Sequence, residues 1–121
     1  MPQPAIDPVA FADLLENVGG DREFMAELVR TYLADSPARF VELRTAIASG
    51  DAAAARRAAH SLKSTSASMG ASKLSRQCRE LEMAAAAGTL AGLEASVDAA
   101  EAEYALAAGE LGRLASAGAD A

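Results

Sequence analysis

Apolar residues recur every three or four positions along most of the chain, and short polar or glycine-containing breaks separate the apolar stretches. This spacing places the apolar side chains on one face of an α-helix. Breaks at residues 19–21, 49–51, 70–72 and 88–89 divide the chain into five helices, the first of them short. We therefore predict an all-α fold, an antiparallel up-down four-helix bundle with a short additional N-terminal helix.

The first two predicted helices begin at aspartates that can cap free backbone N–H groups. Asp7-Pro8 begins a helix that runs toward Asn17, and Asp21 begins the second helix. The apolar stripe of this second helix consists of Phe24, Met25, Leu28, Val29, Tyr32, Phe40, Leu43 and Ile47. Because proline lacks an N–H group and disfavours helical geometry in the residue before it, we expect Ser36-Pro37 to kink or divide this helix.

Similar signals place the other three helices. Asp51 is predicted to cap a helix from Ala52 to about Met69, Ser72 to cap the next one, and Thr89 to start the last. The apolar positions of the fourth helix are Leu74, Cys78 and Leu81, and those of the last are Leu90, Leu93, Val97, Ala100, Tyr104, Leu111 and Leu114.

The length of 121 residues fits one compact domain. We assign residues 1–121 to this domain, with an ordered core of about residues 6–114 and flexible tails. Gly109 and Gly112 weaken the end of the last helix, so we expect the chain from Ala115 onward to fray. Only 4% of the residues are aromatic and alanine is abundant, which favours closely packed helices over sheets.

Charge and cysteine content narrow the classes of partner and compartment. A net charge of −6 provides no chain-wide basic field for nucleic acid or an anionic membrane. No stretch approaches the roughly 20 apolar residues of a membrane span, and residues 1–5 do not resemble the start of a signal peptide. Cys78 is the only cysteine, so no intrachain disulfide can form and we expect a cytoplasmic protein. Cys78 lies between Leu74 and Leu81 on an apolar face, so we expect a core position for it. We also expect a monomer.

The third predicted helix carries the candidate chemistry. Residues three and four positions apart share a helix face, so His60 is grouped with Arg56, Arg57, Lys63 and Ser64. The opposite face, expected to pack into the bundle, consists of Ala55, Ala59, Leu62, Ser66 and Met69. An exposed imidazole is largely neutral near pH 7 and has a ring nitrogen whose lone pair can attack phosphorus. Lys63 can stabilise phosphoryl oxygens, and Ser64 leaves space for a partner's active site.

The segment from His60 to Ser64, followed by Gly70, Leu74, Cys78 and Leu81-Glu82, resembles the signature of the histidine phosphotransfer (HPt) family. The resemblance extends to the break at residues 19–21, the second helix and the turn at residues 49–51. It implies a helical bundle that relays phosphoryl groups between receiver-domain aspartates in two-component signal transduction.

Within this resemblance, His60 is the phosphorylation site and Lys63 is the lysine that stabilises the phosphoryl group. Glu82 occupies the place of the residue on the neighbouring helix that forms a hydrogen bond with the imidazole. Family members often have glutamine there, and they commonly have glycine at the place of Ser64. From helical spacing alone, the alternative to this hydrogen bond is an ion pair between Glu82 and Arg76 or Arg79 on its own helix.

The implied partners are response-regulator receiver domains and a hybrid histidine kinase, and the receiver supplies the aspartyl phosphate and Mg²⁺. The module itself needs no cofactor or metal. Because the chain has no Gly-rich phosphate loop, we predict a phosphocarrier without autonomous kinase activity. Two rival hypotheses are an inert adaptor that binds receivers without carrying phosphate, and a phosphorylatable domain of a larger kinase.

Two surface features leave alternatives open. Arg56 and Arg57 are either solvated charges or groups that steer acidic receivers. Phe11, Leu14 and Leu15 on the short first helix either cover the end of the bundle or contribute an apolar patch for receiver docking.

Overall fold

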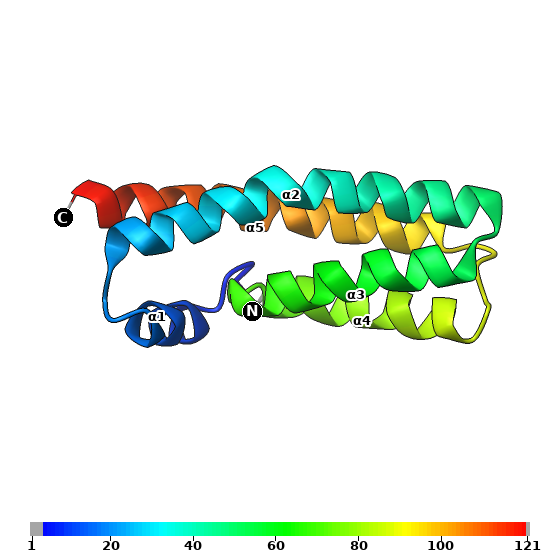
Figure 1. The fold of residues 1–121 in the computed structure, drawn as a ribbon, viewed down its shortest axis with the longest axis horizontal. Helices are drawn as coiled ribbons and strands as arrows, with labels where there is room; N and C mark the ends of the chain where they lie inside the picture. The colour runs from blue at the N-terminus through cyan, green and yellow to red at the C-terminus, as the bar shows by residue number, and fades with distance from the viewer. Residues whose placement is uncertain (1–3, 121) are drawn as a thin grey trace.

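The computed structural model describes the backbone of residues 4–120 and the side chains of residues 4–115. Five helices make up the fold: α1 (Pro8–Asn17), α2 (Arg22–Ser49), α3 (Ala52–Ser68), α4 (Ser72–Ala86) and α5 (Glu94–Asp120). The four long helices lie side by side and alternate in direction along the chain, and α1 lies at one end of them (Figure 1). The prediction of an all-α fold is confirmed. No helix within the described range has the length and apolar character that crossing a bilayer requires.

Helix α2 begins where the sequence predicts, because the Asp21 side chain accepts a hydrogen bond from the backbone N–H of Phe24 at 3.0 Å. The helix then continues through Pro37 without division, so the alternative of two helices is wrong. Pro37 cannot donate to the carbonyl of Leu33, four residues earlier. The hydroxyl of Tyr104 on α5 donates to this carbonyl at 3.4 Å instead. A contact between helices therefore satisfies the acceptor that the proline leaves free.

The inward face of α2 differs from the predicted stripe at one position. Met25, Val29, Tyr32 and several later residues are buried, but Phe24 is 45% exposed. Phe24 lies in the first turn of the helix and points away from the line that Met25 and Val29 follow, because adjacent residues are about 100° apart around a helix. Phe24 therefore belongs to the apolar stripe of the sequence but not to the buried face of the helix.

Two predicted helix starts also need correction. Helix α4 begins at Ser72 itself, and the capping position falls on Ala71, which provides no side-chain hydrogen bond. Helix α5 begins at Glu94, five residues after the predicted start at Thr89. Gly92 adopts a left-handed conformation with φ of 78°, which interrupts a helix, and residues 91–93 form a turn. Local sequence signals did not reveal this turn.

Helix α1 is attached to the junction between α3 and α4. The backbone N–H of Asp7 donates to the carbonyl of Gly70 at 2.7 Å. Gly70 has φ of 81°, and a Cβ atom there would lie 3.2 Å from the carbonyl oxygen of Asp7 and 3.3 Å from the amide nitrogen of Phe11. A glycine is therefore required both to end α3 and to let α1 approach. Phe11 and Leu14 pack against the core, so α1 covers the end of the bundle, and the docking alternative for these residues and Leu15 stays a prediction.

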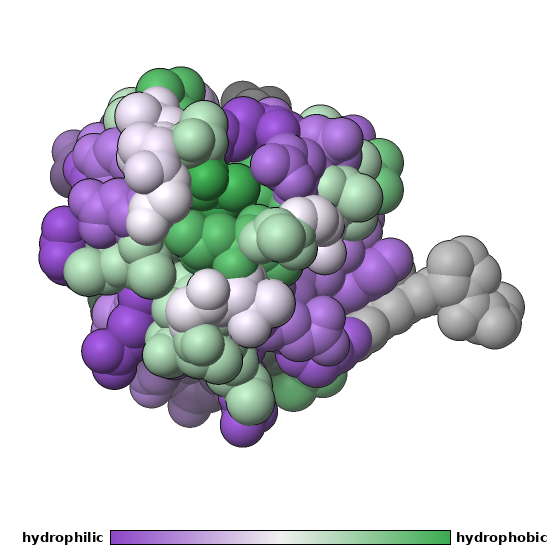
Figure 2. Space-filling view, turned by 90° about the vertical axis from the view of Figure 1, so that its right-hand side faces the viewer, coloured by the Kyte–Doolittle hydropathy of each residue, from purple (hydrophilic) through white to green (hydrophobic). Residues whose placement is uncertain are grey.

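The core runs along the whole bundle and reaches the surface at the end opposite α1. Figure 2 looks at this end, where an apolar patch is visible near the centre, bordered by residues of intermediate hydropathy, with hydrophilic residues farther out. The partly buried residues near the adjoining loops are Ala54, Leu90 and Leu93. On α5, Val97, Ala100 and Leu111 are buried as predicted, whereas Leu114 is 39% exposed because it lies beyond the main core. Helical structure continues to Asp120, past the predicted start of the tail at Ala115.

Candidate phosphorylation site

Helix α3 presents His60 to solvent from a rigid base. Its inward face consists of Ala55, Ala58, Ala59, Leu62 and Ser66, all buried. The Ser66 hydroxyl also lies 2.8 Å from the hydroxyl of Tyr32 on α2. The opposite face carries His60, whose side chain is 59% exposed, together with exposed Arg56, Arg57 and Ser64. The two predicted faces of this helix are thus confirmed.

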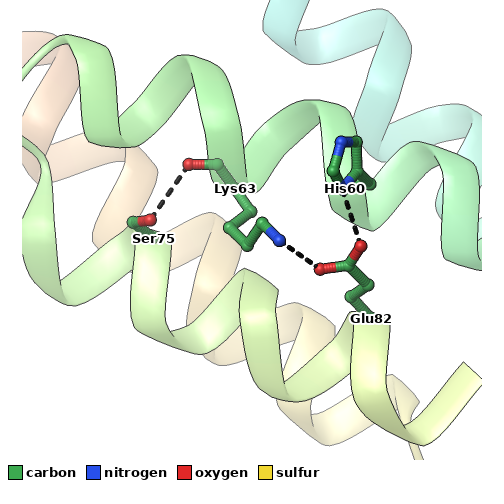
Figure 3. A network of polar contacts seen from close by, with 4 residues as sticks. All are labelled: His60, Lys63, Ser75 and Glu82. Carbon is green, nitrogen blue, oxygen red and sulfur yellow. Dashed lines mark hydrogen bonds and ion pairs between the residues drawn. The ribbon is translucent and has the colours of Figure 1, made fainter.

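Glu82 on α4 connects the two candidate residues of α3. One carboxylate oxygen lies 2.7 Å from Nδ1 of His60, and the other accepts a hydrogen bond from Nζ of Lys63 at 2.6 Å. Figure 3 shows the imidazole with its other nitrogen directed away from Glu82. The carboxylate can only accept, so the Nδ1–H donates, and in the neutral ring Nε2 retains its lone pair. The ring nitrogen directed away from Glu82 is therefore the one with a free lone pair.

The charges at this site favour an ionised Glu82. The hydrogen bond from Lys63 and, to a smaller extent, the one from His60 hold the pKa of the carboxyl below its usual range, against the opposing effect of partial burial. Glu82 is therefore an anion at neutral pH. Lys63 is engaged with this anion, so it is held beside the imidazole and directed toward α4.

This geometry accompanies a clear match to a known family. The family model of the Hpt domain matches residues 27–117 of the chain. The chain belongs to the HPt family. A crystal structure of histidine-containing phosphotransfer protein B (HptB) from Pseudomonas aeruginosa PAO1 is similar to this HPt protein, with a TM-score of 0.85 and 34% sequence identity over 95% of this chain and 97% of that chain. No curated protein matches the chain.

Among the sequence-predicted site residues of this HPt protein, His60, Lys63 and Glu82 come together, whereas Ser64 does not join their hydrogen bonds. Ser64 lies exposed on the turn after His60, and its hydroxyl has no described partner in residues 4–115. Glu82 contacts both α3 residues, so the predicted hydrogen bond between Glu82 and the imidazole of His60 is present in the structure. Cys78 lies in the core, and burial raises the pKa of its thiol to about 12.

Sequence reasoning missed Ser75, which supports the site from α4. Its hydroxyl donates to the backbone carbonyl of Lys63 at 3.0 Å and so attaches α4 to α3 next to the candidate site (Figure 3). A helix carbonyl can accept this second hydrogen bond because it has two lone pairs. The available signal was spacing, since Ser75 precedes Glu82 by two helical turns and shares its face.

The lowered pKa of Glu82 predicts a pH-dependent contribution to the stability of this HPt domain. A carboxyl whose pKa falls on folding stabilises the native state above its ordinary value of 4.5, and this contribution disappears as the pH falls through the folded-state pKa. We expect Glu82→Gln to lower the free energy of unfolding at pH 7, and the difference from wild type to shrink below pH 4.5.

Urea denaturation followed by circular dichroism between pH 3 and pH 7 measures this difference. Glu27→Gln, at an exposed position on α2, is the matched control and should change stability little at any pH. A constant difference between wild type and Glu82→Gln across the whole range would contradict the assigned ion pairs.

Proposed function

We propose that this HPt protein relays a phosphoryl group between receiver-domain aspartates through His60, as a step of two-component signal transduction. The observation that carries the proposal is the exposed imidazole whose Nδ1 is held by Glu82 while Nε2 faces solvent. A short additional N-terminal helix and an antiparallel four-helix bundle provide the rigid support for this ring. The same bundle in HptB, a histidine-containing phosphotransfer protein, supports the assignment.

The ring nitrogens suit a reversible transfer. Nε2 of His60 attacks the phosphorus of an aspartyl phosphate, the N–P bond forms, and the P–O bond to the aspartate breaks to release its carboxylate. The Nδ1 proton stays on the ring, and Glu82 stabilises the positive charge that the phosphorylated imidazole acquires. In the second transfer another aspartate attacks phosphorus, and the neutral imidazole leaves without any change in its Nδ1 proton.

Lys63 supplies a second interaction. Its ammonium group is held one helical turn from His60 by the ion pair with Glu82. The side chain is long and 29% exposed, so it can move from the carboxylate to oxygens of a phosphoryl group on Nε2. Ser64, small and exposed on the same face, leaves room for the active site of a receiver.

We assign the remaining chemistry to the partners. The receiver provides the phosphorylated aspartate and a Mg²⁺ ion that neutralises phosphoryl charge, and a hybrid histidine kinase is the source of the phosphate. This HPt protein then acts as a carrier in the cytoplasm, without kinase activity, metal or cofactor of its own. The donor can also be a kinase domain in the same polypeptide, and the chemistry at His60 is unchanged in that case.

Transfer from a phosphorylated receiver tests the proposal. The purified protein is incubated with Mg²⁺ and each of a panel of radiolabelled phospho-receivers, and with labelled ATP alone as the control. We expect label that is stable to base and labile to acid, as a phosphohistidine is, and no label from ATP alone. Binding of receivers with no transfer of label from any of them would support the inert adaptor instead.

The ammonium group of Lys63 is expected to accelerate this transfer. Lys63→Ala should slow it about tenfold to a hundredfold, because a hydrogen bond to a charged group contributes roughly 1.5–3 kcal/mol. Rapid-quench measurement of the single-turnover rate checks this expectation. Arg30→Ala, which removes an exposed cation from α2, is the control and should transfer at the wild-type rate. Equal rates for Lys63→Ala and wild type would exclude Lys63 from the reaction.

A further inference from the structure

The charge of the protein is divided unevenly between its helices. Helices α3 and α4 together contain six Lys or Arg residues and two Glu residues, which gives them a net charge of +4. The whole chain carries −6, so all other segments together carry −10. The helix pair that presents His60 therefore carries a net positive charge, whereas the rest of the protein is acidic.

Arg56 and Arg57, the two cations that precede His60 on α3, have no acidic partner within the described part of the chain. Arg39, Arg44, Lys63 and Lys73 each form an ion pair with a glutamate or aspartate. Arg56 and Arg57 are both exposed, and no acidic side chain of residues 4–115 pairs with either of them. Their charges are therefore available to groups outside the chain.

These two arginines lie directly beside the nucleophile. Arg57 and Arg56 precede His60 by three and four residues, one helical turn, so all three side chains share a face of α3. The same three residues line a shallow depression that Ala53, Ser61 and Glu82 complete. Since Glu82 already engages Lys63, the positive charge of this depression comes from Arg56 and Arg57. A group that occupies this depression beside His60 therefore lies close to both arginine side chains.

We propose that Arg56 and Arg57 form a docking site for the carboxylates that surround the phospho-acceptor aspartate of a receiver domain. This inference rests on the proposed function and names the chemistry of the partner surface. A receiver that uses Mg²⁺ must hold it with carboxylate oxygens, so the rim of its active site is acidic. Guanidinium groups bind carboxylates in a bidentate geometry. The −10 charge of the other segments repels the same acidic surface and so directs the receiver to the His60 face.

Charge of this kind acts mainly on the rate of encounter. Opposite charges on two partners raise association rate constants by about 10-fold to 1000-fold. Salt suppresses the effect, because the screening length is only about 3 Å at 1 M ionic strength. The arginines should therefore change how fast a receiver associates, and they should leave the rate of phosphoryl transfer inside the complex largely unchanged.

Stopped-flow binding tests the proposal separately from phosphotransfer. All proteins carry His60→Gln, and the probes are fluorescently labelled, Mg²⁺-loaded receiver domains of the response regulators and hybrid kinases from the same genome. Arg56→Glu/Arg57→Glu is compared with Arg30→Glu/Arg113→Glu, which makes the same charge change at exposed positions on α2 and α5. We expect the first pair to lower the association rate constant at least about tenfold at low salt and the second to change it less than about threefold.

Four further results decide the proposal. The loss should shrink toward zero at 1 M salt, and Arg56→Lys/Arg57→Lys should retain most of the wild-type association rate, because it keeps the charge. Equal losses in the two charge-reversed pairs would show an effect of net charge alone and would overturn the proposed docking site. Loss of self-association with unchanged receiver binding, measured by sedimentation, would assign the face to a second copy of the chain and would also overturn it.

The result of this binding experiment can be distinguished from the result of the phosphotransfer experiment that tests the proposed function. Binding to the His60→Gln protein does not require phosphate on the histidine, so the docking site can be refuted while wild type still accepts label. Conversely, absence of label on wild-type protein with every receiver refutes the relay whatever the binding rates are. Thermal unfolding of each charge-reversed variant confirms that both arginine pairs are compared in folded protein.

Discussion

Replacing His60 with glutamine is expected to abolish acceptance of phosphate from every receiver. The amide nitrogen of glutamine has no lone pair available for attack on phosphorus, whereas Nε2 of the imidazole has one and faces solvent. His60 is the only histidine in the chain, so no second imidazole can take its place. We expect acid-labile label on wild type and none above background on His60→Gln.

The fold should survive this substitution. The side chain is 59% exposed, and the glutamine amide can still donate a hydrogen bond to Glu82, which also retains Lys63. The free energy of unfolding should therefore stay within about 0.5 kcal/mol of wild type. Ser64→Ala, one turn further along the same face, is the matched control and should still accept label. Acid-labile label at the wild-type level on His60→Gln would refute the site assignment.

The opposite face of α3 predicts the largest loss of stability. Leu62 lies two residues from His60 and is completely buried between the helices. Leu62→Ala removes three carbons from this packing and leaves a cavity, which costs about 2–5 kcal/mol. Domains of this size are stable by only about 5–15 kcal/mol, so the variant should lose a large part of its stability.

Urea denaturation at 25 °C, followed by the helical signal in circular dichroism, measures this loss. Ser64→Ala changes an exposed residue of the same helix and should alter stability by less than about 0.5 kcal/mol. Under conditions where Leu62→Ala remains folded, it should still accept phosphate, because His60 and Glu82 are unchanged. A loss below about 1 kcal/mol would contradict the packing of α3 described above.

The helix boundaries show which helix starts local sequence signals predict correctly and which they do not. The capping aspartates Asp7, Asp21 and Asp51 mark the starts of three helices correctly, because a cap involves atoms only two or three residues apart. Thr89 was a false start, since the chain must first cross from α4 to α5 through the left-handed turn at Gly92. The geometry of such a crossing depends on where the helices lie, which no local pattern reports.

The continuity of α2 likewise involves tertiary contacts that no local sequence pattern reports. Pro37 removes a helix hydrogen bond and disfavours helical geometry at Ser36. The helix nevertheless continues, and the Tyr104 hydroxyl of α5 donates to the Leu33 carbonyl that the proline leaves free. Packing of the two flanking segments on one core further opposes a break. Tyr104 is 71 residues away from Leu33 in the chain, so sequence spacing alone does not connect them.

The sequence by itself determined that the chain is helical and that His60, Arg56, Arg57 and Lys63 share the outward face of one helix, because helical periodicity is a local property. Only the tertiary structure decided that Glu82 binds both His60 and Lys63, and hence which ring nitrogen is free. Two helices can pack in many registers with the same apolar stripes. The register that brings the carboxylate to the imidazole follows from the interlocking of all the buried side chains, with Ser75 and Gly70 as fixed contacts.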